Sequence, residues 1–275
     1  MSFKRQSDIL RAVRQYGSCD IADLAGRLSV STETIRRNVQ PLIERGEVIR
    51  FHGGIMLPDH LDEPPFHRRM QVNKAEKRKV AEIARSLIND GDTIILDNGT
   101  TTTYVAEALA DKSGLIVITN SAQIACRLAA RNGHRVFMAG GELSGDDAAA
   151  FGHSTVEFVR QFQAKFALLS VAGITAAGDL VDFHMFEAEF SRAAMRQAQE
   201  TWVIADHTKF GREAPVRVCG LSDVDLVVTD QSPKSEFSQL CEERGVRVTS
   251  SHAGELATKK ISTEARSRSP AITEG

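Results

Sequence analysis

Apolar residues recur with a helical period three times in the first 45 residues of the chain. The third stretch follows Ser31, a residue type that caps helix N-termini by accepting a backbone N–H bond. After Gly46, residues 47–54 alternate between apolar and polar positions and end in a Gly-Gly pair, as a strand with a turn does. The helical apolar positions are Ile9, Leu10 and Val13, then Ile21, Leu24, Ala25 and Leu28, then Ile35, Val39, Leu42 and Ile43. The pattern predicts a helix-turn-helix followed by a hairpin wing.

The polar side chains of the third predicted helix are of the kinds that bind DNA. Thr, Arg and Gln hydrogen-bond base edges or phosphates, and two adjacent arginines point about 100° apart on a helix, so that one can reach a base and the other the DNA backbone. We therefore expect DNA contacts from Ser31, Thr32, Thr34, Arg36, Arg37, Gln40, Arg50 and His52. A protein-interaction module without DNA is the alternative, because exposed arginines also occur on ordinary solvated faces.

Two segments of this region, ILRAVRQYGSCDIADLAGRLSV and VSTETIRRNVQPLIERGEVIRFHGG, closely resemble the N-terminal domain of the DeoR-type bacterial repressors. Asn38 stands where that family usually carries Asp, and Val39 where it carries Leu. Because Asn can also cap or bond locally, we expect a helix that is adjusted but not broken. The resemblance implies a winged helix-turn-helix domain over residues 1–56 that binds a double-stranded DNA operator.

Charge and cysteine usage narrow the remaining function classes. The 275 residues carry a formal net charge of -2, but the first 56 hold nine Lys and Arg against six Asp and Glu, so the basic charge is local. The four cysteines are scattered without a CxxC pair, which makes a disulfide framework or a zinc site unexpected. No apolar run suits export or membrane insertion. We expect a cytoplasmic protein with no membrane association, no metal site and no cofactor.

Two segments lack a sustained period. Residues 57–73 contain three prolines and mixed charge, which predicts an extended linker held stiff by the Pro64-Pro65 pair. Residues 251–275 are rich in Ser, Thr, Ala, Lys and Arg without an apolar face, which predicts a disordered tail.

Between these segments, over residues 74–250, helical patterns alternate with short β-branched runs. Such alternation predicts an α/β domain with a mostly parallel sheet covered by helices on both faces. The predicted strands are 93–97, 115–118, 135–139, 166–171, 202–205 and 226–228, and the predicted helices are 75–88, 102–109, 122–131, 155–163, 187–199 and 235–244. Ligands of such sheets bind beyond the carboxyl ends of the strands.

Several of the predicted strands end in residues suited to an anion. Gly99, after the first strand, allows a ligand to approach the backbone, and the threonines that follow it offer hydroxyl and free N–H groups at a helix start. Lys209, in a later turn, supplies a point charge. The expected site contains Asp97, Gly99, Thr100, Thr101, Thr102, Thr119, Asn120, Gly140, Gly141 and Lys209. The predicted ligand is an anionic small molecule.

The resemblance extends through this half in LDNGTTTTYVAEAL, VITNSAQIACRL, MAGGEL, SVAGITAAGDL, FEAEFSRAAM and IADHTKFG, which are similar to the DeoR-type effector domain. That domain is related in fold to ribose-5-phosphate isomerase, and the resemblance implies that it binds phosphorylated sugars or polyols through the residues named above. FVRQFQAKFALLSVAGI and ADHTKFGREA look most like the glycerol-3-phosphate repressor branch. Glycerol 3-phosphate is therefore the first effector expected, with a sugar phosphate as the alternative.

The expected function is that of a homodimeric or homotetrameric repressor, released from its operator by a phosphorylated effector. The alternative is a sugar-phosphate isomerase with a DNA-binding appendage. Such an enzyme needs a carboxylate base, and the carboxylates near predicted loops are Asp97, Asp182, Glu187 and Asp206. Asp97 and Glu187 also have non-catalytic explanations, as a hydroxyl contact and as a charge at a helix start. No catalytic residue is therefore expected.

Overall fold

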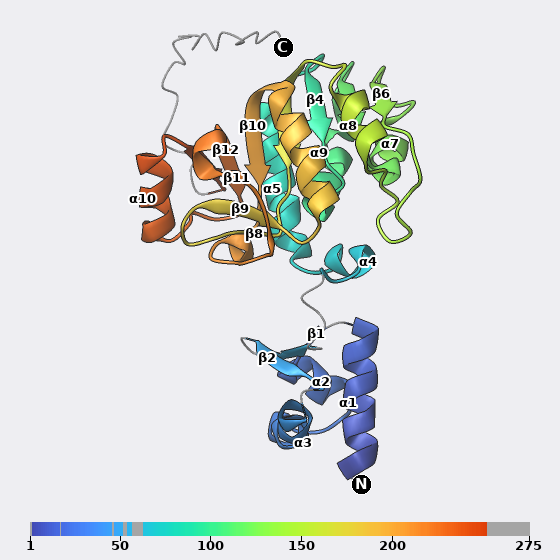
Figure 1. Ribbon diagram of the computed structural model, residues 1–275, viewed down its shortest axis with the longest axis vertical. Coiled ribbons are helices and arrows are strands. Elements are labelled where there is room, and N and C mark those ends of the chain that lie inside the picture. Colours follow the sequence, from blue (N-terminus) through green and yellow to red (C-terminus); the bar gives the residue numbers. More distant parts are fainter. Residues whose placement is uncertain (1, 17, 46, 52–53, 57–62, 252–275) are drawn as a thin grey trace, which may run out of the picture.

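Three helices and a small sheet form the N-terminal unit of the computed structural model (Figure 1). The structure describes residues 2–16, 18–45, 47–51, 54–56 and 63–251. The helices are α1 (Ser2–Tyr16), α2 (Ile21–Arg27) and α3 (Thr32–Glu44). Apolar residues from all three helices, including Ile9, Leu24 and Ile35, are fully buried against one another. The predicted helix-turn-helix is confirmed.

The predicted hairpin is present as strands β2 (Ile49–Phe51) and β3 (Gly54–Met56), which pair antiparallel. A further strand, β1 (Ser18–Asp20), pairs antiparallel with the other edge of β3. We did not predict β1, because three residues are too few to show an alternating pattern.

The larger unit is built on a seven-stranded parallel sheet in the order β13-β12-β10-β7-β4-β5-β6. The strands are β4 (Thr93–Leu96), β5 (Ile116–Thr119), β6 (Arg135–Met138), β7 (Ala164–Leu169), β10 (Ala198–Ile204), β12 (Leu226–Thr229) and β13 (Arg247–Ser250). Six of them were predicted. The edge strand β13 was missed because an edge strand needs no continuous apolar run, and Arg-Val-Thr-Ser has none.

Helices cover both faces of this sheet, as predicted. Along β4, Ile94 packs with side chains of α5, α6 and α7, while the next residue, Ile95, packs with side chains of α8 and α9. A strand buried on both faces reads as a continuous apolar run, which is why β4 was visible in the sequence. The helices are α5 (Lys74–Leu87), α6 (Thr100–Ala108), α7 (Ala122–Leu128), α8 (His153–Val159), α9 (Met185–Arg196) and α10 (Ser235–Glu243), with 3-10 turns at Leu109–Asp111, His207–Lys209 and Leu221–Asp223.

A second, antiparallel sheet of the larger unit was not predicted. It has the order β11-β9-β8, formed by β8 (Gly173–Ile174), β9 (Asp179–Asp182) and β11 (Val216–Gly220). Its strands are short, and the β9–β11 register shifts between Arg217 and Cys219, so its sequence shows no regular alternation. This sheet follows β7 and β10 in the chain and holds the loops that leave those strands.

The described part of the predicted linker, residues 63–73, is not an extended spacer. It contains the short helix α4 (Phe66–Arg69), and we call residues 63–73 the strap. Phe66 is buried, its backbone N–H donates to Asp146 Oδ2 at 2.6 Å, and Tyr104 Oη donates to the Met70 carbonyl at 2.8 Å. The linker prediction is therefore wrong for residues 63–73, because buried Phe66 and Met70, which packs against the core, bind this segment to the sheet unit.

The predicted disordered tail and the predicted lack of membrane insertion have to be judged on the described residues. All of the predicted tail except Ser251 lies outside the described residues. Among the helices of the described residues, none has the length and apolarity needed to cross a membrane.

Candidate DNA-binding helix and ligand cavity

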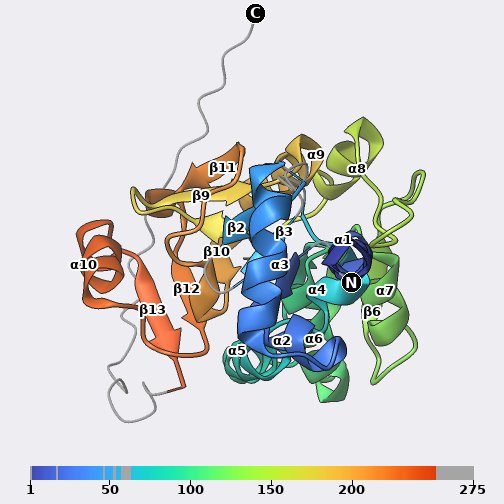
Figure 2. The same ribbon diagram turned by 90° about the horizontal axis from the view of Figure 1, so that it is seen from below.

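Helix α3 presents most of the predicted DNA-contacting residues on one exposed surface. Ser31 caps the helix, because its hydroxyl oxygen accepts the Thr34 backbone N–H at 3.2 Å. Thr32, Arg36, Arg37 and Gln40 are exposed, and Thr34 is half-buried. Figure 2 shows α3 lying across the face of the N-terminal unit that is turned away from the sheet unit. A capped helix with an exposed Arg-rich face has the form that enters the DNA major groove.

The wing lies beside this helix. Arg50 Nη2, on β2, donates to Gln40 Oε1 at 2.9 Å, and Gln40 Nε2 donates to Glu44 Oε1 at 3.1 Å. Arg50 and Gln40 therefore belong to one surface. Arg36 is 3.7 Å from the Glu33 carboxylate in a pair exposed on both sides, which water and DNA phosphates can readily replace. His52, the last predicted contact, lies outside the described residues.

Asn38, where the resemblance showed a departure, is buried within α3. Its Nδ2 donates to the Thr34 carbonyl one turn earlier at 2.8 Å. The expectation of a local bond in an unbroken helix is confirmed.

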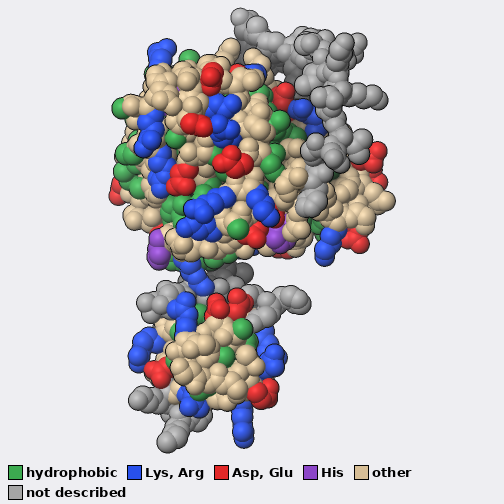
Figure 3. Space-filling view, turned by 180° about the vertical axis from the view of Figure 1, so that it is seen from behind, with side chains coloured by type: hydrophobic (Ala, Val, Ile, Leu, Met, Phe, Trp, Pro, Cys, Tyr) green, Lys and Arg blue, Asp and Glu red, His purple; other side chains and the backbone are tan. Residues whose placement is uncertain are grey.

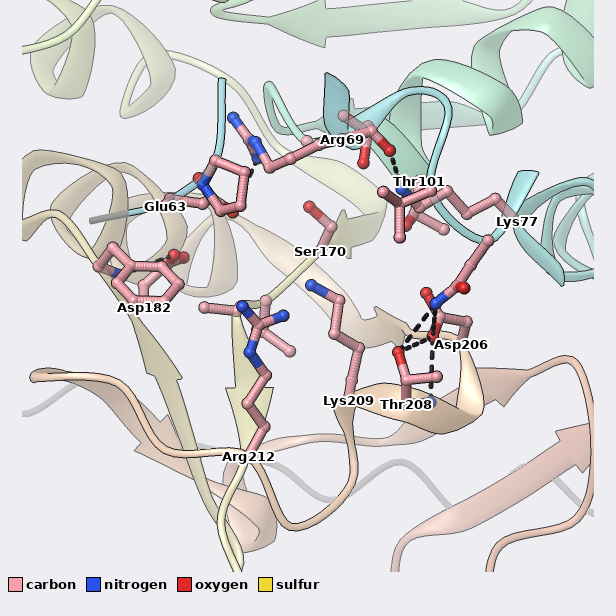
Figure 4. Close-up of a pocket in the computed structure, with 18 of the residues that line it drawn as sticks. Glu63, Arg69, Lys77, Thr101, Ser170, Asp182, Asp206, Thr208, Lys209 and Arg212 are labelled. Carbon is pink, nitrogen blue, oxygen red and sulfur yellow. Dashed lines mark hydrogen bonds and ion pairs between the residues drawn. The ribbon is translucent and has the colours of Figure 1, made fainter. Parts of the chain in front are cut away.

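A cavity of about 1010 Å³ lies at the carboxyl ends of β4, β7 and β10. Figure 4 shows Lys209 and Arg212 pointing into it from the segment that follows β10, while Arg69 points in from the opposite side. Figure 3 shows Lys and Arg side chains at the lower edge of the sheet unit and around the N-terminal unit. The cavity is therefore where parallel sheets place ligands, and it is rich in charged groups.

The turn between β4 and α6 is held by the carboxylate of Asp97. Its Oδ1 accepts the Gly99 N–H at 3.0 Å and the Thr102 hydroxyl at 2.6 Å, and its Oδ2 accepts the Ser170 N–H at 2.6 Å. Burial raises the pKa of Asp97 to about 6, against these hydrogen bonds, which lower it. Asp97 therefore shapes the cavity wall, since both of its oxygens are occupied by its own chain.

The first turn of α6 offers the cavity an anion-binding surface. Its N-cap, Gly99, has no side chain to accept the free N–H groups of the turn, and Thr100 and Thr101 line the cavity. Thr102 does not line it, because its hydroxyl donates to Asp97 and to the Gly99 carbonyl at 2.8 Å. Of the predicted threonines, Thr100 and Thr101 are thus the two that can meet a ligand.

Two lysines bring positive charge to the same cavity. Lys209, which was predicted, is half-buried, and burial followed by the nearby Arg212 lowers its pKa. Lys77, which was not predicted, is 4% exposed, and burial followed by Lys209 lowers its pKa to about 8. The sequence did carry a signal for Lys77, because it precedes Val80 and Ala81 by three and four positions and so lies on the apolar stripe of α5. Among the described residues Lys77 has no ion-pair partner, and its Nζ donates only to the Arg69 carbonyl, so this buried ammonium suits an anionic ligand.

Buried carboxyl groups line the other part of the cavity. Burial, followed by the charge of Glu63, raises the pKa of Asp182 to about 7, and burial, followed by Asp182, raises that of Glu187 to about 9. Asn98 Nδ2 donates to Glu187 Oε1 at 3.3 Å, while Glu187 Oε2 is buried without a hydrogen-bond partner among the described residues. A protonated carboxyl can donate to a ligand hydroxyl and accept from another.

Replacing Glu187 with Gln is expected to stabilise the protein progressively as the pH rises. The pKa of Glu187 is higher folded than unfolded, so the wild type loses stability between about pH 4.5 and about 9, whereas Gln does not titrate. The difference in the free energy of unfolding should grow by up to about 1.4 kcal/mol per pH unit. Urea unfolding at pH 5 and 8 measures it, with Glu189→Gln on the exposed face of α9 as the control. Equal pH dependence in wild type and Glu187→Gln would contradict the assignment.

Besides Thr102, the structure leaves four of the predicted residues outside the cavity. Thr119 and Asn120 follow β5, and Gly140 and Gly141 follow β6, whereas the cavity lies over β4, β7 and β10. Both β5 and β6 lie on the far side of β4 from β7. Asn120 Nδ2 instead donates to the Ala150 carbonyl at 3.0 Å, holding the loop before α8. The prediction treated all strand ends as equivalent, which the strand order does not allow.

A winged helix joined to a parallel-sheet unit with a charged cavity defines a ligand-responsive DNA-binding protein. Two family models match the chain: the DeoR-like helix-turn-helix domain over residues 5–60 and the DeoR C terminal sensor domain over residues 72–231. The chain belongs to the DeoR family, as its motifs indicated. We call the two units the winged helix and the sensor domain.

Relatives match nearly the whole chain. The glycerol-3-phosphate regulon repressor of Escherichia coli (strain K12) is 34% identical over 245 residues, which cover 89% of this chain and 97% of the relative. The HTH-type transcriptional repressor GlcR of Bacillus subtilis (strain 168) is 31% identical over 241 residues, covering 87% and 93%. Among solved structures, a D-ribose-5-phosphate isomerase in complex with phospho-erythronic acid matches with a TM-score of 0.38 and 15% identity, covering 50% of this chain and 54% of that one.

Proposed function

We propose that this protein is a transcriptional repressor that leaves its operator when a phosphorylated polyol or sugar, in the first instance glycerol 3-phosphate, binds in the sensor cavity. The observation that carries this proposal is the convergence of Lys77, Lys209 and the start of α6 in one cavity, within a chain that also presents an Arg-rich recognition helix. Relatives named as repressors, including two named for the glycerol-3-phosphate regulon, support it.

The ligand class follows from the two kinds of groups around the cavity. The α6 N–H groups and the lysines suit a phosphate, while the carboxyl groups of Asp182 and Glu187 suit hydroxyls. A small phosphorylated polyol offers both. Glycerol 3-phosphate is preferred over a sugar phosphate because of the named relatives, and the cavity volume also accommodates a larger sugar.

Release requires that the ligand bind the DNA-incompetent arrangement more tightly than the competent one. A hundredfold loss of operator affinity corresponds to about 2.7 kcal/mol of such preference. We propose a cytoplasmic homodimer or homotetramer, whose two recognition helices would enter successive major grooves about 34 Å apart. The operator is then a repeated half-site.

A regulatory role is favoured over sugar-phosphate isomerisation. An isomerase needs a carboxylate free to remove a proton from the substrate carbon. Asp97, the carboxylate nearest the α6 turn in sequence, accepts three hydrogen bonds from its own chain. Turnover of ribose 5-phosphate by the purified protein, lost in Asp97→Ala, would overturn this choice.

Calorimetric titration with glycerol 3-phosphate, ribose 5-phosphate, fructose 6-phosphate and glycerol tests the sensor proposal. Glycerol 3-phosphate is expected to bind saturably and glycerol is not, because the phosphate supplies the charge contacts. Lys209→Ala should weaken binding about tenfold to a hundredfold, the range for losing one charged hydrogen bond. Lys79→Ala, on the exposed side of α5, is the matched control. Preferred binding of a pentose or hexose phosphate would change the effector within the class, and binding of none of the four would overturn the sensor role.

A further inference from the structure

The strap forms part of the cavity wall, although it is also the segment that leads to the winged helix. Glu63, Arg69 and Asn73 all line the cavity, and Arg69 enters it opposite Lys209 and Arg212 (Figure 4). Asn73 Nδ2 donates to Asp206 Oδ1 at 3.2 Å, and Lys77 Nζ donates to the Arg69 carbonyl. A ligand in the cavity therefore meets the chain that connects the two domains.

One ion pair within the strap faces this cavity. Arg69 Nη1 and Glu63 Oε1 are 2.8 Å apart, and their side chains are 16% and 9% exposed. Arg69 Nε is buried and has no hydrogen-bond partner among the described residues. A guanidinium binds a phosphate with two parallel N–H groups, and here one buried N–H lacks an acceptor while another is held by a carboxylate.

Charge balance identifies the group that must move when an anion enters. The described lining contains five cationic side chains and six carboxyl groups. Burial favours the protonated, neutral forms of Asp182 and Glu187, and Asp206 Oδ1 accepts bonds from Thr208 and Asn73. Glu63 is the cavity carboxylate that is ion-paired with a cavity arginine in the described structure. A phosphate placed on Arg69 would lie against Glu63, and two anions repel strongly where water is excluded.

We propose that Arg69 is an effector-binding residue and that Glu63 is an internal anion that occupies it until the phosphate group of the effector displaces it. This inference rests on the proposed sensor function and names the element through which the cavity signals. Displacement frees the start of the strap but leaves its anchor, because Phe66 is held separately by burial and by Asp146.

The displaced length is enough to alter how the winged helices are spaced. Six residues, 57–62, separate β3 from Glu63 in the sequence. Pro65 stays with α4, because its carbonyl accepts the Arg68 and Arg69 N–H groups, so freeing residues 63 and 64 adds two residues to this connection, or up to ~7 Å of reach at about 3.4 Å per residue. Two winged helices must match half-sites about 34 Å apart, so a looser connection weakens simultaneous binding.

Calorimetry on the full chain, with glycerol 3-phosphate and inorganic phosphate as probes, tests the displacement. Glu63→Gln should bind both about tenfold more tightly than wild type, because the competing charge is gone. Arg69→Gln should bind both at least tenfold more weakly, and adding Glu63→Gln to it should restore little. Glu213→Gln removes an exposed carboxylate that also lines the cavity, and a change under threefold is expected there. Arg69→Lys keeps the charge but not the paired N–H groups, and should fall between wild type and Arg69→Gln.

The outcomes separate this inference from the proposal beneath it. If the wild type binds the ligand and Glu63→Gln binds it with unchanged or weaker affinity, the displacement is overturned and the sensor role is left intact. The same holds if Arg69→Gln and Arg69→Lys fold, by thermal unfolding, and bind as the wild type does. Binding by Glu63→Gln alone supports the displacement strongly, and binding by none of the proteins overturns both proposals.

Discussion

Gly99→Ala is expected to lower the free energy of unfolding of the sensor domain by about 3 kcal/mol, at the upper end for an overpacked core, and to abolish ligand binding. A Cβ at this position would lie 1.6 Å from Ser170 Oγ and 2.6 Å from Ser170 Cβ. The backbone that follows β4 or the backbone that follows β7 must therefore move. That movement breaks the Asp97 hydrogen bonds that hold the first turn of α6. Chemical unfolding and calorimetric titration measure the two effects.

The structure supplies both a control and a rescue for this change. Gly140 follows β6 as Gly99 follows β4, but a Cβ at Gly140 would meet nothing within 4 Å, so Gly140→Ala should be nearly neutral. Replacing Ser170 with Gly in the Gly99→Ala background removes the clashing atoms and keeps the backbone N–H that Asp97 accepts, so stability should partly return. Similar losses in Gly99→Ala and Gly140→Ala, or no recovery when the Ser170 side chain is removed, would show that the close approach of Gly99 to Ser170 is not the cause.

Replacing both Arg36 and Arg37 with Ala is expected to weaken operator binding at least a hundredfold while ligand binding is retained. Each base or phosphate contact of this kind contributes roughly 1–3 kcal/mol. The residues are exposed on α3, and α3 packs in a hydrophobic core separate from that of the sensor domain. Fluorescence anisotropy with operator DNA, in parallel with ligand calorimetry, measures both properties.

The single variants Arg36→Ala and Arg37→Ala distinguish the arginine that contacts a base from the one that contacts a phosphate. The arginine that reads a base should, when removed, relax sequence preference. The one that contacts phosphate should weaken binding to all sequences and reduce the log–log salt slope by about 0.9. Arg11→Ala, which removes an exposed charge from α1, is the control. An unchanged operator affinity in the double variant would mean that α3 is not the recognition helix.

Local patterns were sufficient for most of the fold. Apolar periodicity and the Ser31 cap predicted the helix-turn-helix, and the apolar runs at β4, β5, β7 and β10 predicted a parallel sheet with two covered faces. The strands that were missed, β1, β8, β9, β11 and β13, are short or at edges, where pairing with a neighbour replaces side-chain pattern as the determinant.

The candidate site was harder to predict from the sequence than the fold was. The residues around Asp97 and Lys209 were predicted because glycine, threonine and lysine that follow a strand are residue types suited to an anion. Lys77 was overlooked because a lysine on a helix is usually solvated, whereas here its Nζ contacts the Arg69 carbonyl of the strap. Glu63 and Arg69 were overlooked because two prolines favour an extended chain, and nothing nearby shows that Phe66 is an anchor.

The sequence by itself determined the long helices, the central strands and the family, because caps, periodicity and short motifs act over a few neighbouring residues. Only the tertiary structure decided which strand ends meet. The order β10-β7-β4-β5-β6 places Lys209 near Gly99 and leaves Gly140 outside the cavity. It also decided that the strap closes one wall, since that contact joins Phe66 to a residue 80 positions away. Such pairings depend on how whole elements pack, and no local stretch of sequence encodes them.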